Sequence, residues 1–418
     1  MGQLLVTLIV PPIVGLVTYI IVRRIWERDD NGAKAVSRRE PSAVAQAEET
    51  QRGISEVMSV LPRKRTCAGS RLRTFKDFEF DAFAPLGSLL SARCWSLGMR
   101  TNQHFAILLT CLVVTSAACA QDFKVTLLGT GSPLPIPDRF GAATLVEAGK
   151  EKLLFDVGRG ATIRLNQIGV PIGAINAVFL THFHSDHTSG MPDLWLTGWI
   201  GRYYGNRQSP FRVIGPKGTL SLMQNLQRAY DDDIRIRSED EKNPLEGVAV
   251  VASEYANDGV VYETNGVKVT AFEVDHGPLI KPAYGYRVDF EGRSVIISGD
   301  TRYSENLEKH AQGATLVIHE VAIPNQEYYE KTPIVKYIMA HHISPEEAGA
   351  LFARVKPKLA AYTHLVFLGS PDYPTPTVAD IERKTREKYS GPLALGTDLM
   401  AFDVRKDQVI VIPDAYRK

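Results

Sequence analysis

Cysteine is scarce in this sequence and is confined to its first part. The 418 residues contain four cysteines, which are Cys67, Cys94, Cys111 and Cys119. No disulfide and no thiolate ligand can form after residue 119, so a metal site there must use histidine and carboxylate side chains. A covalent mechanism with a cysteine nucleophile is excluded for the same segment.

An excess of charge of one sign is also missing. Lys and Arg number 48, Asp and Glu number 47, and the formal net charge is +1. This balance provides no long-range attraction to nucleic acid or to an anionic membrane surface. We therefore expect a small-molecule partner and no nucleic acid.

Residues 1–28 contain a long apolar run followed by basic residues. The run extends from Leu4 to Val22 without a charge, and Arg23, Arg24 and Arg28 follow it. A membrane-spanning helix needs about 20 such residues, and flanking arginines favour the cytoplasmic side. The pattern predicts a transmembrane segment, and a buried helix is the alternative.

The next 92 residues predict a linker followed by an export signal. Residues 29–98 are polar and basic without sustained periodicity, which indicates a disordered linker. In residues 99–120 an apolar run follows Arg100 and ends in Ala118-Cys119-Ala120, which fits the cleavage pattern of a signal peptide. Translation starts at Met99, or else the chain crosses the membrane twice and stays uncleaved. Either way, we expect residues 121–418 to be periplasmic or secreted, and attached to the membrane if uncleaved.

From residue 121 strands and helices alternate in short runs. Segments such as 123–129 and 177–180 are apolar and β-rich, whereas 344–355 has helical spacing, with Ser344 as its N-cap. Hairpin turns interrupt the alternation, as at 291–293. This order predicts an α/β sandwich of sheets covered by helices rather than a doubly wound parallel sheet.

The strongest chemical signal is a cluster of histidine and aspartate at the end of an apolar strand. Residues 181–187 read THFHSDH, with His182, His184, Asp186 and His187. Four ionisable groups beside a buried strand are costly without a partner, and imidazole and carboxylate are ligands of zinc-like metals. A cluster of surface or core histidines is the alternative reading of this segment.

The HxHxDH pattern resembles the signature of the metallo-β-lactamase superfamily. The segments INAVFLTHFHSDHTSGMPDL, LLGTGSPLPIPDRFGAA and LLFDVGRGATIRL resemble its ribonuclease Z branch, and the last places Asp156 beside the site. The resemblance covers residues 121–418. It implies the metallo-β-lactamase fold, a four-layer αββα sandwich.

The resemblance also implies two metal ions, with Zn²⁺ expected and Mn²⁺ or Fe as alternatives. It assigns one ion to His182, His184, His276 and Asp300, and the other to Asp186, His187, Asp300 and His364. His276, Asp300 and His364 each follow an apolar strand. Singly each could be a satisfied core residue, but as an ordered set they fit ligands.

A second histidine group is expected to act on the substrate. The segments IHEVA and HHISPEEAG resemble ribonuclease Z motifs in which His342 contacts the substrate or protonates the leaving group, with Glu320 orienting it. A one-residue slip would exchange His341 for His342. Two metals lower the pKa of a shared water to form the attacking hydroxide, which Asp186 and Asp300 help to fix.

The expected substrate is a sulfate ester. Aromatic residues follow the first motif, and these passages resemble exported arylsulfatases of this fold. Trp195, Trp199, Tyr203 and Tyr204 are candidate pocket residues, with core packing as the alternative. The long Gly-Pro-rich arm with which ribonuclease Z clamps tRNA is not evident. A phosphodiesterase acting on a small phosphodiester or nucleotide is the alternative, a lactonase is third, and an inactive binding protein is a further class. A homodimer is compatible with the sequence.

Overall fold

The structure, a computed structural model, describes residues 122–201 and 203–416. The predictions for residues 1–120 lie outside the described residues. Among the described helices, none combines the length and the apolar character that a membrane span requires.

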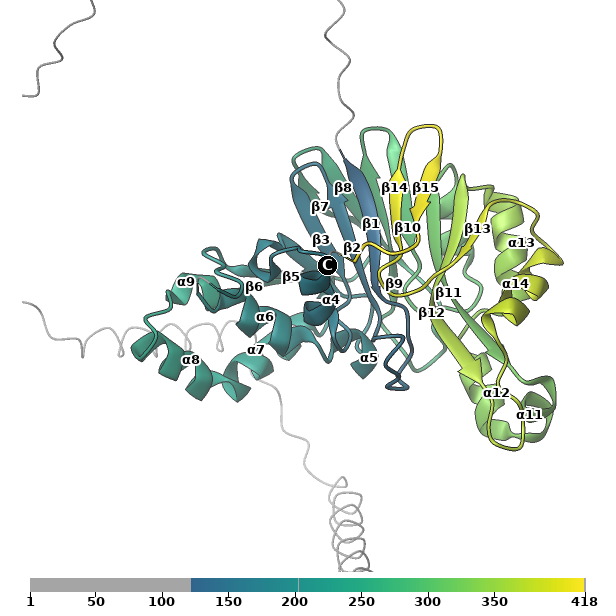
Figure 1. The fold of residues 1–418 in the computed structure, drawn as a ribbon, viewed down its shortest axis with the longest axis horizontal. Helices are drawn as coiled ribbons and strands as arrows, with labels where there is room; N and C mark the ends of the chain where they lie inside the picture. The colour runs from purple at the N-terminus through teal and green to yellow at the C-terminus, as the bar shows by residue number, and fades with distance from the viewer. Residues whose placement is uncertain (1–121, 202, 417–418) are drawn as a thin grey trace, which may run out of the picture. The chain divides into compact units, whose positions relative to one another are not determined.

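Two mixed β-sheets form the centre of the molecule (Figure 1). The eight-stranded sheet has, in spatial order, β15 (Val409–Ile412), β14 (Ala401–Val404), β1 (Phe123–Gly129), β2 (Ala143–Ala148), β3 (Glu151–Phe155), β4 (Ala177–Phe179), β5 (Phe211–Pro216) and β6 (Val250–Tyr255). The seven-stranded sheet has β13 (Leu393–Leu395), β12 (Leu359–Leu368), β11 (Leu316–Pro324), β10 (Arg293–Ile297), β9 (Tyr284–Phe290), β8 (Val267–Glu273) and β7 (Gly259–Thr264). Each sheet has a run of parallel strands, β3 to β6 in one and β10 to β13 in the other.

The main core lies between the sheets because alternate residues of each strand point inward. Phe123, Phe155 and Phe179 of one sheet share a buried cluster with Tyr286 and Ile297 of the other. Phe155 stacks on Phe179 with ring centroids 4.8 Å apart, and both meet the edge of Tyr286. Burial of these apolar faces is the principal force that holds the sheets together.

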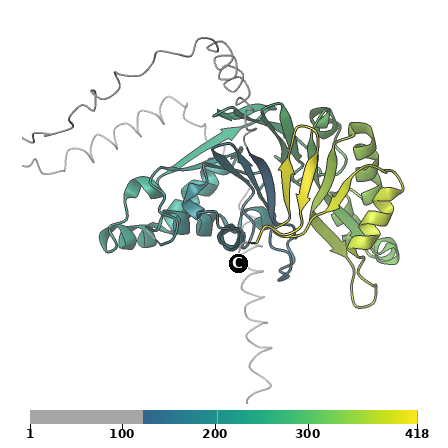
Figure 2. The same cartoon turned by 45° about the horizontal axis from the view of Figure 1, so that its top comes forward.

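Helices cover the outer face of each sheet (Figures 1 and 2). The eight-stranded sheet is accompanied by α4 (Ala161–Gln167), η1 (Ile172–Ala174), α5 (Ser185–Thr188), α6 (Met191–Trp199), α7 (Thr219–Ala229), α8 (Asp231–Glu239) and α9 (Leu245–Val248). The seven-stranded sheet is accompanied by α10 (Glu305–Ala311), α11 (Gln326–Lys331), α12 (Pro333–Met339), α13 (Pro345–Val355) and α14 (Val378–Arg386). The predicted four-layer αββα sandwich is confirmed.

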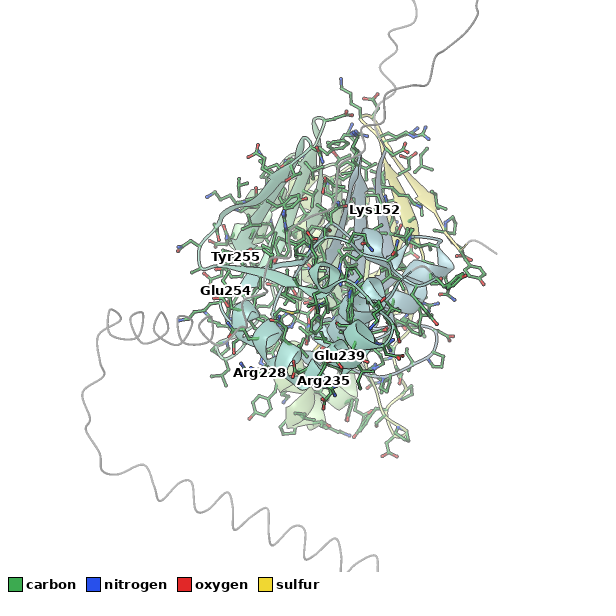
Figure 3. All side chains as sticks on the ribbon, turned by 90° about the vertical axis from the view of Figure 1, so that its left-hand side faces the viewer. Lys152, Arg228, Arg235, Glu239, Glu254 and Tyr255 are labelled. Carbon is green, nitrogen blue, oxygen red and sulfur yellow. The ribbon has the colours of Figure 1, made fainter. Side chains whose placement is uncertain are left out.

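Helix α8 has no buried side chain. Figure 3 shows the face on which its Arg235 and Glu239 lie; these side chains are 53% and 70% exposed and form an ion pair at 3.7 Å. Solvated pairs of this kind contribute little to stability. The charged residues of α8 therefore form a solvated face.

Candidate metal centre

The first histidine motif occupies the turn between β4 and α6. β4 ends at Phe179, and His184 precedes the short helix α5 with an extended backbone. The side chains of His182, Asp186 and His187 are at most 2% exposed, whereas His184 is exposed. The turn thus holds its ligands at the end of the eight-stranded sheet, with one imidazole facing the solvent.

The other three predicted ligands come from the seven-stranded sheet. His276 follows β8, Asp300 follows β10, and His364 lies within β12. All three are at most 3% exposed. The ends of neighbouring strands meet at one edge of a sheet, which brings residues distant in sequence together.

The Oδ2 atom of Asp300 is the point on which the imidazoles converge. It lies 3.3 Å from Nε2 of His187 and of His364, 3.7 Å from Nε2 of His276, and 3.9 Å from Nε2 of His182. Two ligand groups result. The candidate group called the first metal site comprises His182, His184, His276 and Asp300. The candidate group called the second metal site comprises Asp186, His187 and His364, with Asp300 close to both histidines.

The chemistry of these side chains fits divalent cations. Burial, with the neighbouring His187, holds the pKa of His182 well below its usual range, and burial lowers the pKa of His276 to about 4. Both rings are therefore neutral, the form that binds metals. Nε2 of His182 and of His187 is buried without a hydrogen-bond partner among the described residues. Buried polar atoms of this kind are costly unless they are ligated.

Asp156 and Thr181 orient two of the ligands from behind. His182 Nδ1 donates to Thr181 Oγ1 at 2.9 Å, and Thr181 in turn donates to Asp156 Oδ2 at 2.8 Å. His187 Nδ1 donates to the same carboxylate oxygen at 2.7 Å. Such partners fix the ring orientation and raise the basicity of the ligand. The sequence placed Asp156 beside the site, but nothing in it indicated the role of Thr181.

The structure gives different contacts to His341 and His342, between which the sequence did not decide. His342 Nδ1 lies 3.1 Å from Glu320 Oε2, and its ring is grouped with Asp300 and His364. His341 instead offers its backbone carbonyl, which accepts from His276 Nδ1 at 2.9 Å. Glu320 Oε1 also accepts from the backbone amides of Thr301 and Ile343, which holds the carboxylate in place.

The charge of His342 follows from this contact. Burial opposes its protonated form, but the Glu320 carboxylate outweighs burial and raises the pKa of His342 to about 9. The ring is then a cation at neutral pH. A protonated imidazole beside a metal pair can stabilise an oxyanion or donate a proton to a leaving oxygen.

Comparison with known proteins finds relatives that match about two thirds of this chain. A ribonuclease Z of Mycobacterium marinum is 34% identical over 285 residues, covering 67% of this chain and 98% of the relative. A ribonuclease Z of Mycolicibacterium gilvum is 36% identical over 247 residues, covering 58% and 84%. The chain belongs to the ribonuclease Z-like family of the metallo-β-lactamase fold. A profile of the family described as anti-Pycsar protein Apyc1 also matches, over residues 123–330.

Solved structures with low sequence identity show the same fold. The metallo-β-lactamase-fold protein YhfI of Bacillus subtilis has a TM-score of 0.53 at 18% identity, covering 67% of this chain and 99% of that one. The short form of human tRNase Z has a TM-score of 0.50 at 23% identity, covering 68% and 99%. These structures show the same fold as this chain. Because the chain belongs to the ribonuclease Z-like family, it is a metal-dependent hydrolase.

Two predictions are changed by membership of the ribonuclease Z-like family. The expectation that nucleic acid is no partner is wrong, because the relatives that match along almost their whole length are ribonucleases. The balanced net charge misled, since it averages over the whole chain and does not report the field at the site. The further resemblance to exported arylsulfatases is not supported by these relatives.

The structure does not bring the four candidate aromatic residues to one pocket. Trp195 and Trp199 of α6 are 0% exposed, and their indole N–H groups donate to backbone carbonyls within residues 244–248. Tyr203 and Tyr204 follow the helix and are 92% and 63% exposed. The tryptophans are core residues because their spacing places both on the buried face of α6.

Proposed function

We propose that the chain is a two-metal phosphodiesterase that hydrolyses a phosphodiester bond of RNA or of a nucleotide. The observation that carries the proposal is the set of seven convergent ligands in a chain that spans 98% of a ribonuclease Z. The preference for sulfate esters rested on aromatic residues, and two of those are core residues.

The ligand set suits two ions, with Zn²⁺ as the first choice and Mn²⁺ or Fe as alternatives. Imidazole and carboxylate donors serve all three metals, so the metal in the cell depends on availability. Two bound cations would lower the pKa of a water held between them and neutralise charge on the ester oxygens. His182, His184 and His276 would hold one ion, Asp186, His187 and His364 the other, and Asp300 both.

The remaining steps of the reaction are assigned to side chains of this chain. Asp186 Oδ2 lies 3.0 Å from His364 Nε2, so this carboxylate can both hold an ion and orient the attacking water. His342, kept protonated by Glu320, donates its proton to the oxygen that leaves. The exposed His184 marks the side from which the ester enters.

A substrate panel tests this proposal on the full chain loaded with zinc. Bis-nitrophenyl phosphate should be hydrolysed at least about a hundredfold faster than nitrophenyl sulfate or a lactone, a gap of about 3 kcal/mol in activation free energy. A precursor tRNA and a dinucleotide then distinguish RNA from a small phosphodiester. Faster cleavage of the sulfate ester would reverse the assignment.

We also propose that the catalytic domain is exported. Support comes from Arg100, the apolar run up to residue 120 and the small residues Ala118 and Ala120. The amino-terminal residue of purified native protein should then be Gln121. An unprocessed chain in the cytoplasm would contradict export without touching the chemistry of the metal centre.

A further inference from the structure

Four buried histidines of the candidate metal centre present one ring nitrogen to Asp300, and in three of them the other nitrogen has a partner in the protein. The inward nitrogen is Nε2 in His182, His187, His276 and His364, because each Nε2 faces Asp300 Oδ2. The outward Nδ1 atoms of the first three meet Thr181, Asp156 and the His341 carbonyl.

His364 departs from this pattern. Its Nδ1 atom is buried and has no hydrogen-bond partner among the described residues. Two further buried polar atoms nearby share this property, Asp300 Oδ1 and Thr363 Oγ1. Metal-bound histidines almost always donate their second N–H to an acceptor, so the outer partner of His364 needs an explanation.

A small cavity lies beside these residues. Its volume is about 20 Å³, and Asp300, Thr363 and His364 line it together with His187 and Asp156. Asp186, His182, His184 and His276 do not line it, so it lies behind the second metal site rather than in it. About 10–15 Å³ suffices for one water, provided that two to four polar partners surround it.

A bulge in β12 explains why two consecutive side chains reach one cavity. His319 pairs with Tyr362 and Val321 with Leu365, so two residues of β12 stand opposite the single residue Glu320 of β11. His364 has a φ of 43°, in the left-handed region. A bulge of this kind breaks the alternation of side chains and redirects them. Thr363 and His364 can therefore face the same side.

We propose that this cavity binds one water molecule, which accepts from His364 Nδ1 and from the Thr363 hydroxyl and donates to Asp300 Oδ1. The water and Thr363 then do for His364 what Thr181 and Asp156 do for His182 and His187. Thr363 is a positioning residue for the second metal site. The inference depends on the metal centre but not on which ester the enzyme cleaves.

The test compares two substitutions at Thr363 with one at a matched position. Thr363→Val keeps the shape and removes the hydroxyl, and Thr363→Ser keeps the hydroxyl. Thr126→Val is the control, because Thr126 is also buried with an unpartnered hydroxyl but does not line the cavity. All are made in the full chain, and the affinity for Zn²⁺ is measured by competition with a chelator.

We expect Thr363→Val to weaken binding of the second zinc by about 10- to 100-fold, the usual effect of losing an outer partner. Thr363→Ser should restore the affinity, and Thr126→Val should leave it unchanged. With Co²⁺ in place of zinc, the visible absorption bands should shift only in Thr363→Val. A crystal structure of the metal-loaded protein should show an ordered water at the three polar atoms.

Several outcomes would overturn the inference. Wild-type affinity and spectrum in Thr363→Val would do so, as would a Thr363→Ser variant that binds as weakly as Thr363→Val. Equal weakening in Thr126→Val would show that the loss of any buried hydroxyl weakens zinc binding. A crystal structure of the metal-loaded protein with an empty cavity would disprove the proposed water. A wild-type chain that binds no metal would disprove the metal centre itself. If the tests at Thr363 succeed but the enzyme cleaves sulfate esters instead of phosphodiesters, only the proposed function is wrong.

Discussion

Asp300 lies among four imidazoles, with its Oδ2 atom within 3.9 Å of an Nε2 atom of each. The carboxylate is buried, which by itself would disfavour its charge, but His364 and His187 hold its pKa well below the usual range. It is therefore an anion at neutral pH. A shared anion is what two adjacent cations require.

Asp300→Asn tests this residue. The amide keeps the shape but removes the charge that both metals share, so we expect loss of at least one metal per chain and a fall in turnover of more than about a hundredfold. Elemental analysis and phosphodiester hydrolysis measure both. Asp289→Asn on β9, which breaks only the pair with Arg287, is the control. Intact turnover in Asp300→Asn would refute the metal assignment.

The pair of Glu320 and His342 predicts a pH dependence. The pKa of His342 is raised to about 9, so its protonated form is present below that pH and is lost as the pH rises through it. Hydrolysis should therefore decline on the alkaline side. In Glu320→Gln the anion is gone, and the decline should move by about one unit or more to lower pH.

The pH profile of kcat is the measurement for this pair. His341→Asn serves as the control, because His341 acts through its backbone carbonyl and should keep the alkaline decline where it is in the wild type. A profile of Glu320→Gln that coincides with that of the wild type would exclude His342 as the proton donor.

At the scale of elements, α13 connects helix stability with the site. Ser344 accepts from the backbone amide of Glu347, whose side chain accepts from the Ser344 amide, so both ends of the capping box are present. The preceding residue, Ile343, donates to Glu320. The start of this helix thus holds the segment that carries His342.

Ser344→Ala should lower the free energy of unfolding by about 1 kcal/mol, the usual effect of removing an N-cap. It should also lower kcat, because the segment beside Glu320 becomes less ordered. Thr377→Ala removes the capping box of α14, whose side-chain hydrogen bonds join Thr377 only to Asp380, and should affect stability alone. Denaturant unfolding and kcat distinguish the two, and equal kcat in both variants would contradict the connection.

At the scale of the whole molecule, the candidate metal centre takes its residues from both sheets. His182, Asp186 and His187 follow β4 of the eight-stranded sheet, whereas Asp300 follows β10 and His364 lies within β12 of the other sheet. Ions bound by both groups would connect the sheets at the edge where their strands end. Their contribution to stability adds to that of the buried core between the sheets.

Removal of metal should therefore destabilise the fold as well as abolish activity. A ligand at a thousand times its dissociation constant stabilises the native state by about 4 kcal/mol, so a chelator should lower the Tm and zinc should restore it. Calorimetry of the full chain before and after chelation measures this. An unchanged Tm after verified loss of metal would show that the sheets do not depend on the ions.

Much of this molecule was predictable from the order of its residues. A carboxylate and imidazole ligand set followed from the lack of cysteine and from THFHSDH, and the cap of α13 followed from Ser344 before Pro345. These features are local, because spacing along one strand or helix decides them. The fold class also followed, since short alternating runs with hairpins permit few architectures.

Tertiary structure decided what depends on segments far apart in the chain. Only packing shows that Trp195 and Trp199 are core residues, since helical spacing describes a pocket wall and a buried face equally well. Only the contact with Glu320 distinguishes His342 from His341, because a shift of one residue turns a side chain to another neighbour. The bulge that turns Thr363 and His364 together arises from the pairing of β11 with β12, and no pattern within either strand records it.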